Sequence, residues 1–271
     1  MRLSVLLDEF LCECEYKNLS AITIRNYSRI LNEFINAINV SDVEELNRYI
    51  IKDYINSLPL AVSSKNQYLR CISAFWHWYE SEYDTDLRIK VKRLKEKRGI
   101  KYTPTDEEVK RLYDYYNNKS YLGARNKTMI SVLVNLGVRG NELLGLKKSD
   151  IDFRNDIITV RNRKGNIDQQ LPLNKEVKLQ LTKYLNRYGN KNDSDLLFVT
   201  RNGYRLSLRD IGYILKKCNS KLTAHSLRRY CCTTMLKQGI PLVMVSRFMN
   251  HSSIEVTNSY YADIKATDID W

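Results

Sequence analysis

Apolar side chains recur at intervals of three and four through the first ~85 residues, which is the spacing of amphipathic helices. The clearest stretch has the apolar positions Ile24, Tyr27, Ile30, Leu31, Phe34, Ile35 and Ile38. Ser41 and Glu44 form a predicted capping box before the next helix, and Ser63 or Ser64 begins another one. With an opening helix around Leu3–Tyr16, the pattern predicts a module of four helices without strands.

The second part of the chain has a mixed pattern. Alternating polar and apolar positions predict strands at Ile157–Arg161 and Gln169–Leu173, joined by a hairpin turn at Gly165, with a candidate third strand at Leu196–Val199. Thr105 and Glu108 form a capping box that opens the first helix of this part. The further predicted helices are Ala124–Leu136, Glu176–Tyr188, Ser207–Cys218, His225–Lys237, Leu242–Met249 and Ile254–Tyr261.

A basic stretch, Arg88–Gly99, separates the two parts and ends near Pro104. Its clustered charge and its glycine and proline are typical of a linker. We therefore predict an N-terminal helical domain at 1–87, a basic linker at 88–103 and a C-terminal domain at 104–271. The expected fold class is mainly α with a small antiparallel β-sheet (α+β).

Charge points to a polyanionic partner. The chain has 44 Lys and Arg against 31 Asp and Glu, a formal net charge of +13. Such an excess favours nucleic acid, because each neutralised phosphate releases counterions; charge that serves only solubility is the plainer alternative. The linker is then expected to lie along a DNA backbone.

Other classes are disfavoured. Apolar runs stay far below the roughly 20 residues of a membrane span, and Asp8 and Glu9 interrupt any signal-peptide core. The six cysteines form no CxxC pair and no cluster with zinc spacing. We expect a cytoplasmic protein without a metal site and without membrane contact.

Several residues of the C-terminal part stand where an anion would bind. His225 and Arg228 are three apart on a predicted helix and therefore share a face. A guanidinium offers a fork of donors that suits two phosphate oxygens, and an imidazole beside it can donate a hydrogen bond or move a proton. Arg139 stands at a helix end, where backbone N–H groups also favour an anion. His251 precedes a helix that carries Tyr260, nine residues later.

Each of these residues has a plainer interpretation when taken alone. Arg139 is equally well explained as the ion-pair partner of Glu142, three residues on. His251 is equally well explained as a helix cap, and an H-x-x-R pair is usually a surface feature. Tyr260 is one of 19 tyrosines and is followed directly by Tyr261. The order of the residues is more specific than any one of them.

In order and spacing, the chain resembles the tyrosine recombinase (phage integrase-like) family, in its simple, Xer-like two-domain type. The catalytic domain of that family carries an arginine in an R-x-x-E setting, a lysine in a β-hairpin turn, H-x-x-R, a histidine, and a tyrosine nine residues after it. The residues that match are Arg139, Lys164, His225, Arg228, His251 and Tyr260. The motifs cover most of residues 100–271, and the N-terminal helices are compatible with the family's core-binding (SAM-like) domain.

The resemblance implies cleavage of DNA strands without metal, ATP or other cofactor. Tyr260 would attack a phosphate and form a 3′-phosphotyrosyl link with a free 5′-hydroxyl. Lys164 would protonate the leaving oxygen. His225 would orient or deprotonate the attacking tyrosine. Glu142 would fix the first arginine or its loop. The donors that would stabilise charge on the non-bridging oxygens are Arg139, Arg228 and His251.

The chain departs from the family pattern at three places. Asn250 stands where the family commonly has glycine, and we expect it to accept left-handed backbone geometry. Ile167, Asp168 and Gln169 replace basic residues, which is expected to weaken phosphate contacts in the hairpin. Only residues 261–271 follow Tyr260, so the way in which subunits couple is left open.

The implied function is that of a site-specific DNA recombinase that works through a Holliday junction, as in integration, excision or resolution of DNA elements or chromosome dimers. Its partners would be double-stranded DNA with an inverted-repeat core site and three further copies of the chain, as a homotetramer on two duplexes; accessory proteins stay open. One alternative is a type IB topoisomerase-like enzyme that relaxes a single duplex. The other is a catalytically inactive DNA-binding relative. The DNA target itself is not revealed.

Overall fold

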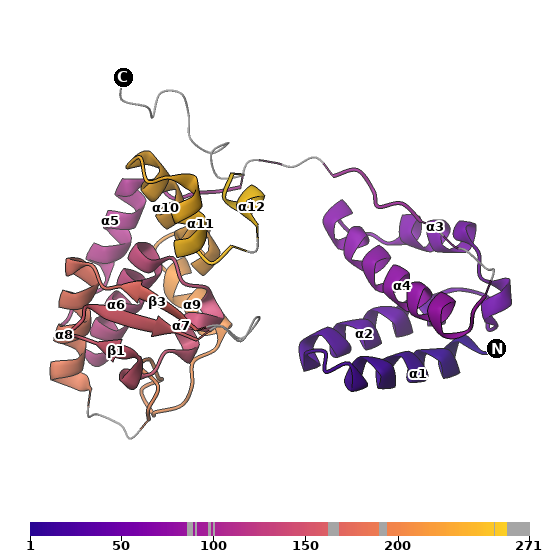
Figure 1. The fold of residues 1–271 in the computed structure, drawn as a ribbon, viewed down its shortest axis with the longest axis horizontal. Coiled ribbons are helices and arrows are strands. Elements are labelled where there is room, and N and C mark those ends of the chain that lie inside the picture. Colours follow the sequence, from indigo (N-terminus) through magenta and orange to yellow (C-terminus); the bar gives the residue numbers. More distant parts are fainter. Residues whose placement is uncertain are drawn as a thin grey trace. The chain divides into compact units, whose positions relative to one another are not determined.

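The computed structural model describes residues 1–85, 89, 91–96, 99, 101–161, 168–189, 194–251 and 253–258. The chain divides into two compact units, Met1–Gly99 and Ile100–Trp271, each taken by itself below (Figure 1). Among the predicted site residues, Lys164 and Tyr260 lie outside the described residues, as does Tyr261.

The first unit is a helical module. Its elements are α1 (Leu3–Tyr16), α2 (Ala21–Ala37), a 3-10 helix (Val43–Glu45), α3 (Arg48–Ser57) and α4 (Val62–Glu82). Helix α1 packs against α2 and α4, and α3 packs against α4. The largest fully buried side chains of the unit are aromatic and belong to one hydrophobic cluster: Phe34, Phe75 and Trp76. The expected four helices are therefore present.

The predicted start of the third helix is wrong. Asn47, and not Ser41, caps α3: its Oδ1 accepts the backbone N–H groups of Tyr49 and Ile50 at 2.9 and 3.2 Å. Glu44 instead pairs with the N-terminal ammonium at 2.8 Å. The carboxylate of Glu44, which the local pattern had assigned to a helix cap, thus pairs with the distant chain terminus instead.

Part of the predicted linker is held on α4. Asn66, buried in α4, accepts the Leu94 N–H at 2.8 Å and donates to the Leu94 carbonyl oxygen at 3.1 Å. An asparagine side chain offers one acceptor and two donors, so it can pair with a backbone unit as a neighbouring strand would. The basic stretch is therefore tied to the first unit at this point.

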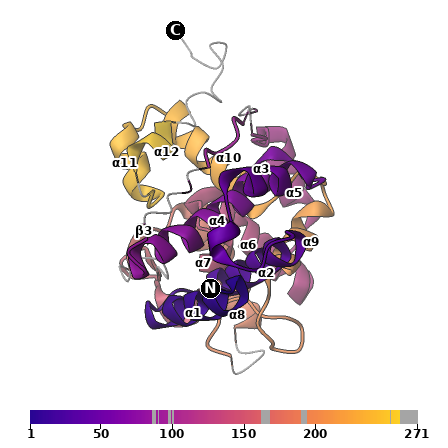
Figure 2. The same cartoon turned by 90° about the vertical axis from the view of Figure 1, so that its right-hand side faces the viewer.

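The second unit surrounds α6, which is buried on nearly all sides. Its helices are α5 (Asp106–Tyr115), α6 (Tyr121–Leu136), α7 (Gly140–Gly145), α8 (Lys175–Tyr188), α9 (Leu208–Lys216), α10 (Ala224–Lys237), α11 (Leu242–Phe248) and α12 (Ile254–Asn258). The predicted capping box of α5, Thr105 with Glu108, is confirmed. Helices α10, α11 and α12 lie at one end of the unit in both views (Figure 2).

A three-stranded antiparallel sheet in the order β1-β2-β3 completes the second unit. Its strands are β1 (Ile151–Asp152), β2 (Ile157–Val160) and β3 (Gln169–Pro172). Val160 pairs with Gln169, and Ile158 with Leu171, so the predicted hairpin is confirmed at its described ends. The turn itself lies outside the described residues.

The candidate third strand, Leu196–Val199, is wrong. Leu196 and Val199 form only isolated bridges, with Lys147 and Arg205. The third strand is instead the two-residue β1, which is too short to show alternation in the sequence. The predicted fold class, mainly α with a small antiparallel sheet, is confirmed.

Gly137 ends α6 in the left-handed region, with φ of 58°. A Cβ built here would lie 2.8 Å from Met249 Cε and 3.2 Å from Cys231 Sγ. We expect Gly137→Ala to lower the free energy of unfolding by about 2 kcal/mol, because the backbone is strained for alanine and the buried Met249 must shift. Urea unfolding measures the change.

Gly212→Ala is the control, because a Cβ at this position of α9 meets nothing within 4 Å. It should be neutral or stabilising by up to about 1 kcal/mol. Equal effects of the two variants would contradict this account.

Candidate active site

Arg228 lies in the interior of the second unit. Thr223 caps α10 by accepting the Ser226 N–H at 3.0 Å, and Arg228 follows in the first turns of this helix. Its side chain is 4% exposed. Nη1 donates to the Gly137 carbonyl oxygen at 2.6 Å, and Nη2 donates to that of Met249. The guanidinium therefore joins the end of α6 to the end of α11.

Arg139 stands at the N-terminus of α7 and is the more open of the two arginines, with a side chain 43% exposed. Glu142 holds it twice: Oε1 accepts from Nη1 and Oε2 accepts from the backbone N–H, both at 2.7 Å. The Arg139 Nη2 donates to the Asn250 carbonyl oxygen, also at 2.7 Å. The ion pair with Glu142 and a role in the site are therefore compatible, because the pair orients the fork toward Asn250.

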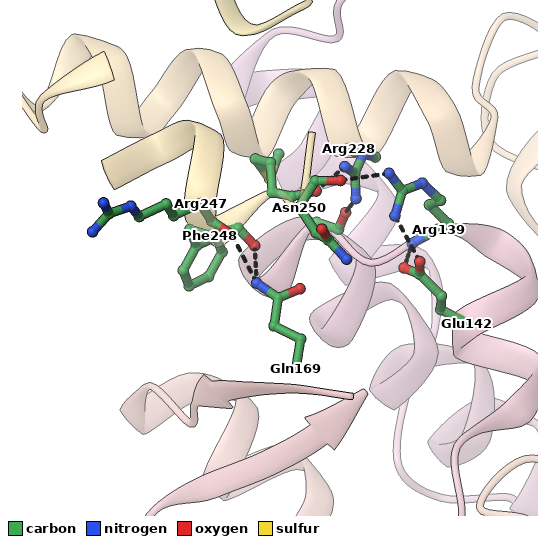
Figure 3. A network of polar contacts seen from close by, with 9 residues as sticks. Arg139, Glu142, Gln169, Arg228, Arg247, Phe248 and Asn250 are labelled. Carbon is green, nitrogen blue, oxygen red and sulfur yellow. Dashed lines mark hydrogen bonds and ion pairs between the residues drawn. The ribbon is translucent and has the colours of Figure 1, made fainter. Parts of the chain in front are cut away.

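The backbone turns sharply between α11 and α12. Asn250 adopts a φ of 47°, as its tolerance for left-handed geometry predicted. Figure 3 shows the carbonyl groups at this corner and the side chains that reach them. Gln169, at the start of β3, donates through Nε2 to the carbonyl oxygens of Arg247 and Phe248 at 2.9 and 3.0 Å. Four consecutive carbonyl groups, 247–250, thus accept from Gln169, Arg228 and Arg139.

His251 follows this corner directly. Its Nδ1 lies 2.7 Å from the Oγ1 of Thr257, a fully buried residue of α12. Burial lowers the pKa of His251 to about 4, helped by the positive charges of Arg228 and Arg139 and by His225. The imidazole is therefore neutral near pH 7 and can donate a hydrogen bond only from one ring nitrogen.

His225 lies in the first turn of α10 and is half-buried. Burial lowers its pKa, and the positive charges of Arg229, Lys101, Arg228 and Arg139 add to this shift. A basic cluster that lowers the pKa of two histidines is a place where an anion is favoured. The end of the predicted linker at Lys101 belongs to this cluster.

These four predicted residues, Arg139, His225, Arg228 and His251, are brought together from α7, α10 and the α11–α12 corner. Lys164 belongs to the segment between β2 and β3, and Tyr260 follows Asn258, the last residue of α12, by two positions. The positions of both side chains lie outside the described residues.

Sequence reasoning missed the contact of Gln169. In the sequence it stood only as a replacement for a basic residue. The structure turns its amide toward α11, which lies 78 residues away along the chain. No local pattern carries that signal, because it depends on how the sheet and α11 pack.

No group of three or more His, Cys, Asp or Glu side chains suited to a metal ion occurs among the described residues. In the same part of the chain, no helix has the length and apolar character needed to cross a membrane.

Comparisons with known proteins identify the family of this chain. A model of the phage integrase family matches residues 103–267, and a model of the phage integrase N-terminal SAM-like domain matches residues 6–85. The tyrosine recombinase XerA of Pyrococcus furiosus is 28% identical over 267 residues, covering 95% of this chain and 89% of that protein. The tyrosine recombinase XerC of Thermodesulfovibrio yellowstonii is 26% identical over 268 residues, covering 92% and 88%.

Solved structures share the fold. An integrase of the transposon Tn1549 in complex with transposon right end DNA matches with a TM-score of 0.81 at 19% identity, covering 99% of this chain and 97% of that one. A lambda integrase dimer bound to a core site matches with a TM-score of 0.78 at 17% identity, covering 100% and 98%. The chain therefore belongs to the phage integrase family and is a site-specific tyrosine recombinase.

The half-buried His251 predicts how stability depends on pH. The pKa of His251 is about 4 in the folded chain and about 6.5 in an unfolded one. As the pH falls from 7 to 4, the unfolded chain takes up this proton first, so the free energy of unfolding decreases through that window. We expect His251→Gln to weaken the decrease, measured by urea unfolding at pH 7, 6 and 5. His77→Gln, on an exposed face of α4, is the control; an unchanged pH dependence in His251→Gln would refute the assignment.

Proposed function

We propose that the enzyme cleaves and rejoins DNA strands at the site formed by α7, α10 and the α11–α12 corner. The observation that carries this proposal is the convergence of Arg139, Arg228 and His251 from three separate elements. In-line attack on a phosphodiester builds negative charge on the non-bridging oxygens, and donors fixed beforehand stabilise that charge most effectively. Two oriented guanidinium groups and a neutral imidazole are such donors.

The two arginines would have different tasks. Arg139 is partly exposed and held by Glu142, so it can meet a phosphate at the surface. Arg228 is nearly buried and bonded to the carbonyl groups of Gly137 and Met249. A phosphate oxygen that binds Arg228 would therefore approach beside the Met249–Asn250 corner. We expect DNA binding to adjust that corner rather than the end of α6.

The nucleophile would be Tyr260 and the acid Lys164. Tyr260 Oη attacks the phosphorus, and its proton passes to His225 or to solvent. The bond to the 5′-oxygen breaks, and Lys164 gives that oxygen a proton. The phosphotyrosyl link stores the bond energy, so a 5′-hydroxyl from another duplex can reverse the step. No step of this sequence consumes a cofactor.

The substrate would be double-stranded DNA with an inverted-repeat core site, bound by a homotetramer on two duplexes. The net charge of +13 suits such a polyanion, and the integrase structures similar in fold contain transposon DNA or a core site. Residues 1–87 would bind the core DNA, residues 104–271 would hold the chemistry, and residues 88–103 would follow the backbone between them. We expect the enzyme to act in the cytoplasm, with or without accessory proteins.

A nicked suicide substrate tests the proposal. A duplex is first selected from random DNA by binding to the protein, and then nicked just downstream of the cleavage position. Cleavage releases a short oligonucleotide with a 5′-hydroxyl, so rejoining fails and the covalent complex accumulates. We expect a band on a denaturing gel that protease removes. Binding of the selected duplex without any such band would favour the inactive DNA-binding relative.

A further inference from the structure

Four side-chain hydrogen bonds reach the carbonyl groups at the C-terminal end of α11 and just beyond it. The last carbonyl groups of a helix have no partner within the helix and carry the negative end of its dipole. Here Met249 O and Asn250 O accept from the two arginines of the site, while Arg247 O and Phe248 O accept from Gln169 (Figure 3). Gln169 is the neutral member of this set.

The sheet fixes the backbone from which Gln169 reaches α11. Gln169 is the first residue of β3 and pairs with Val160, the last residue of β2. Its side chain is therefore anchored at the end of the ladder, and its amide bridges two neighbouring carbonyl groups of α11 at 2.9 and 3.0 Å. Two hydrogen bonds of good length from one nitrogen limit how far the helix end can move away from β3.

The position of α11 determines where His251 lies. The Asn250 N–H donates to Arg247 O at 3.0 Å, and the His251 N–H donates to Ser246 O at 3.1 Å. Arg247 O thus accepts from Gln169 and from the Asn250 backbone together. A shift of this carbonyl group moves the corner that carries His251 and that touches both arginines.

We propose that Gln169 is a positioning residue for DNA cleavage: it holds the end of α11 so that the α11–α12 corner and His251 meet Arg139 and Arg228 in the reactive arrangement. The inference rests on the proposed function. Gln169 donates without adding a charge beside the two guanidinium groups, so it fixes the corner and leaves the phosphate to the arginines.

Gln169→Glu tests this role, because the two side chains have the same shape. The carboxylate cannot donate, and it faces two carbonyl oxygens that it repels. Residues that orient metal ligands through such hydrogen bonds contribute about 10- to 100-fold to activity, and we take the same order for a residue that orients the α11–α12 corner. We expect the single-turnover rate of cleavage at saturating DNA to fall by at least about 10-fold, while the dissociation constant for DNA changes by less than about twofold.

Gln170→Glu is the matched control. Gln170 is the next residue of β3 and is exposed. Its change to Glu introduces the same charge on the opposite face of the strand. We expect it to cleave at the rate of the natural protein. A fall in rate equal to that of Gln169→Glu would mean that charge in the hairpin, and not the bond to α11, is responsible, and would overturn the proposal.

Hydrogen–deuterium exchange gives a second readout that does not depend on activity. Backbone amides of residues 245–251 should exchange faster in Gln169→Glu than in the natural protein or in Gln170→Glu. If Gln169→Glu does not fold, Gln169→Met, which fills similar space without a donor, takes its place. Faster exchange with an undiminished cleavage rate would refute the positioning role. If the natural protein itself forms no covalent complex, the proposed function fails first, and the positioning role fails with it.

Discussion

Arg228→Lys is expected to lower the rate of DNA cleavage by at least about a hundredfold, which is the usual cost of removing one donor that stabilises charge in a transition state. Lysine keeps the charge but loses the planar fork, so it cannot bond Gly137 O and Met249 O and also face a phosphate. The variant should still bind DNA, because the exchange leaves the net charge of +13 unchanged. Single-turnover cleavage and DNA binding, measured on the same duplex, separate the two effects.

Folding must be checked in this variant, because Arg228 is almost fully buried. Two carbonyl groups that lose their donors cost about 1–3 kcal/mol each where they stay buried, and urea unfolding measures the total. Arg154→Lys, at an exposed position between β1 and β2, controls for the exchange as such. A folded Arg228→Lys protein that cleaves within tenfold of the natural rate would show that Arg228 does not bind the scissile phosphate.

Tyr260→Phe is expected to abolish covalent attachment to DNA, whereas Tyr261→Phe should retain it. Phenylalanine keeps the ring and removes only the oxygen that would form the phosphotyrosyl bond. In the helix that the sequence predicts over Ile254–Tyr261, successive side chains would point about 100° apart, so only one of the two tyrosines would face the arginines. The nine-residue interval from His251 selects Tyr260.

The measurement is the amount of covalent complex that each variant forms on the nicked substrate. Both variants should bind the duplex as the natural protein does, since neither change alters charge. If Tyr260→Phe still forms the complex and Tyr261→Phe does not, the nucleophile is Tyr261. Loss in both variants would indicate that the segment needs both rings and would leave the assignment to direct mapping.

The helix periodicity of the sequence predicted most of the fold. The predictions failed where contacts between residues far apart in the chain determine the local structure. The capping box at Thr105 formed because both of its partners are local. The box expected at Ser41 failed because Glu44 found the N-terminal ammonium. Strand β1 is only two residues long, and its pairing with β2 comes from the compact unit rather than from alternation.

In the site, too, some features were predicted from the sequence and others depend on the packing of distant elements. The order and spacing of Arg139, His225, Arg228 and His251 predicted residues that the fold does bring together. The carbonyl groups that hold the two arginines were beyond prediction, because they belong to Gly137, Met249 and Asn250, and backbone groups leave no residue type to recognise. Gln169 was beyond it for another reason. The sequence marks it only as a replacement for a basic residue, and its contact with α11 depends on how β3 lies against that helix.

The central claim is that Tyr260 becomes covalently joined to DNA at the site of Arg139, Arg228 and His251. The most direct test traps the natural protein on the nicked duplex, digests it with protease and maps the modified residue by mass spectrometry. The account predicts a nucleotide adduct through a 3′-phosphate on Tyr260. An adduct on Tyr261 or on any other residue, or DNA cut at the site without an adduct on the protein, would contradict it.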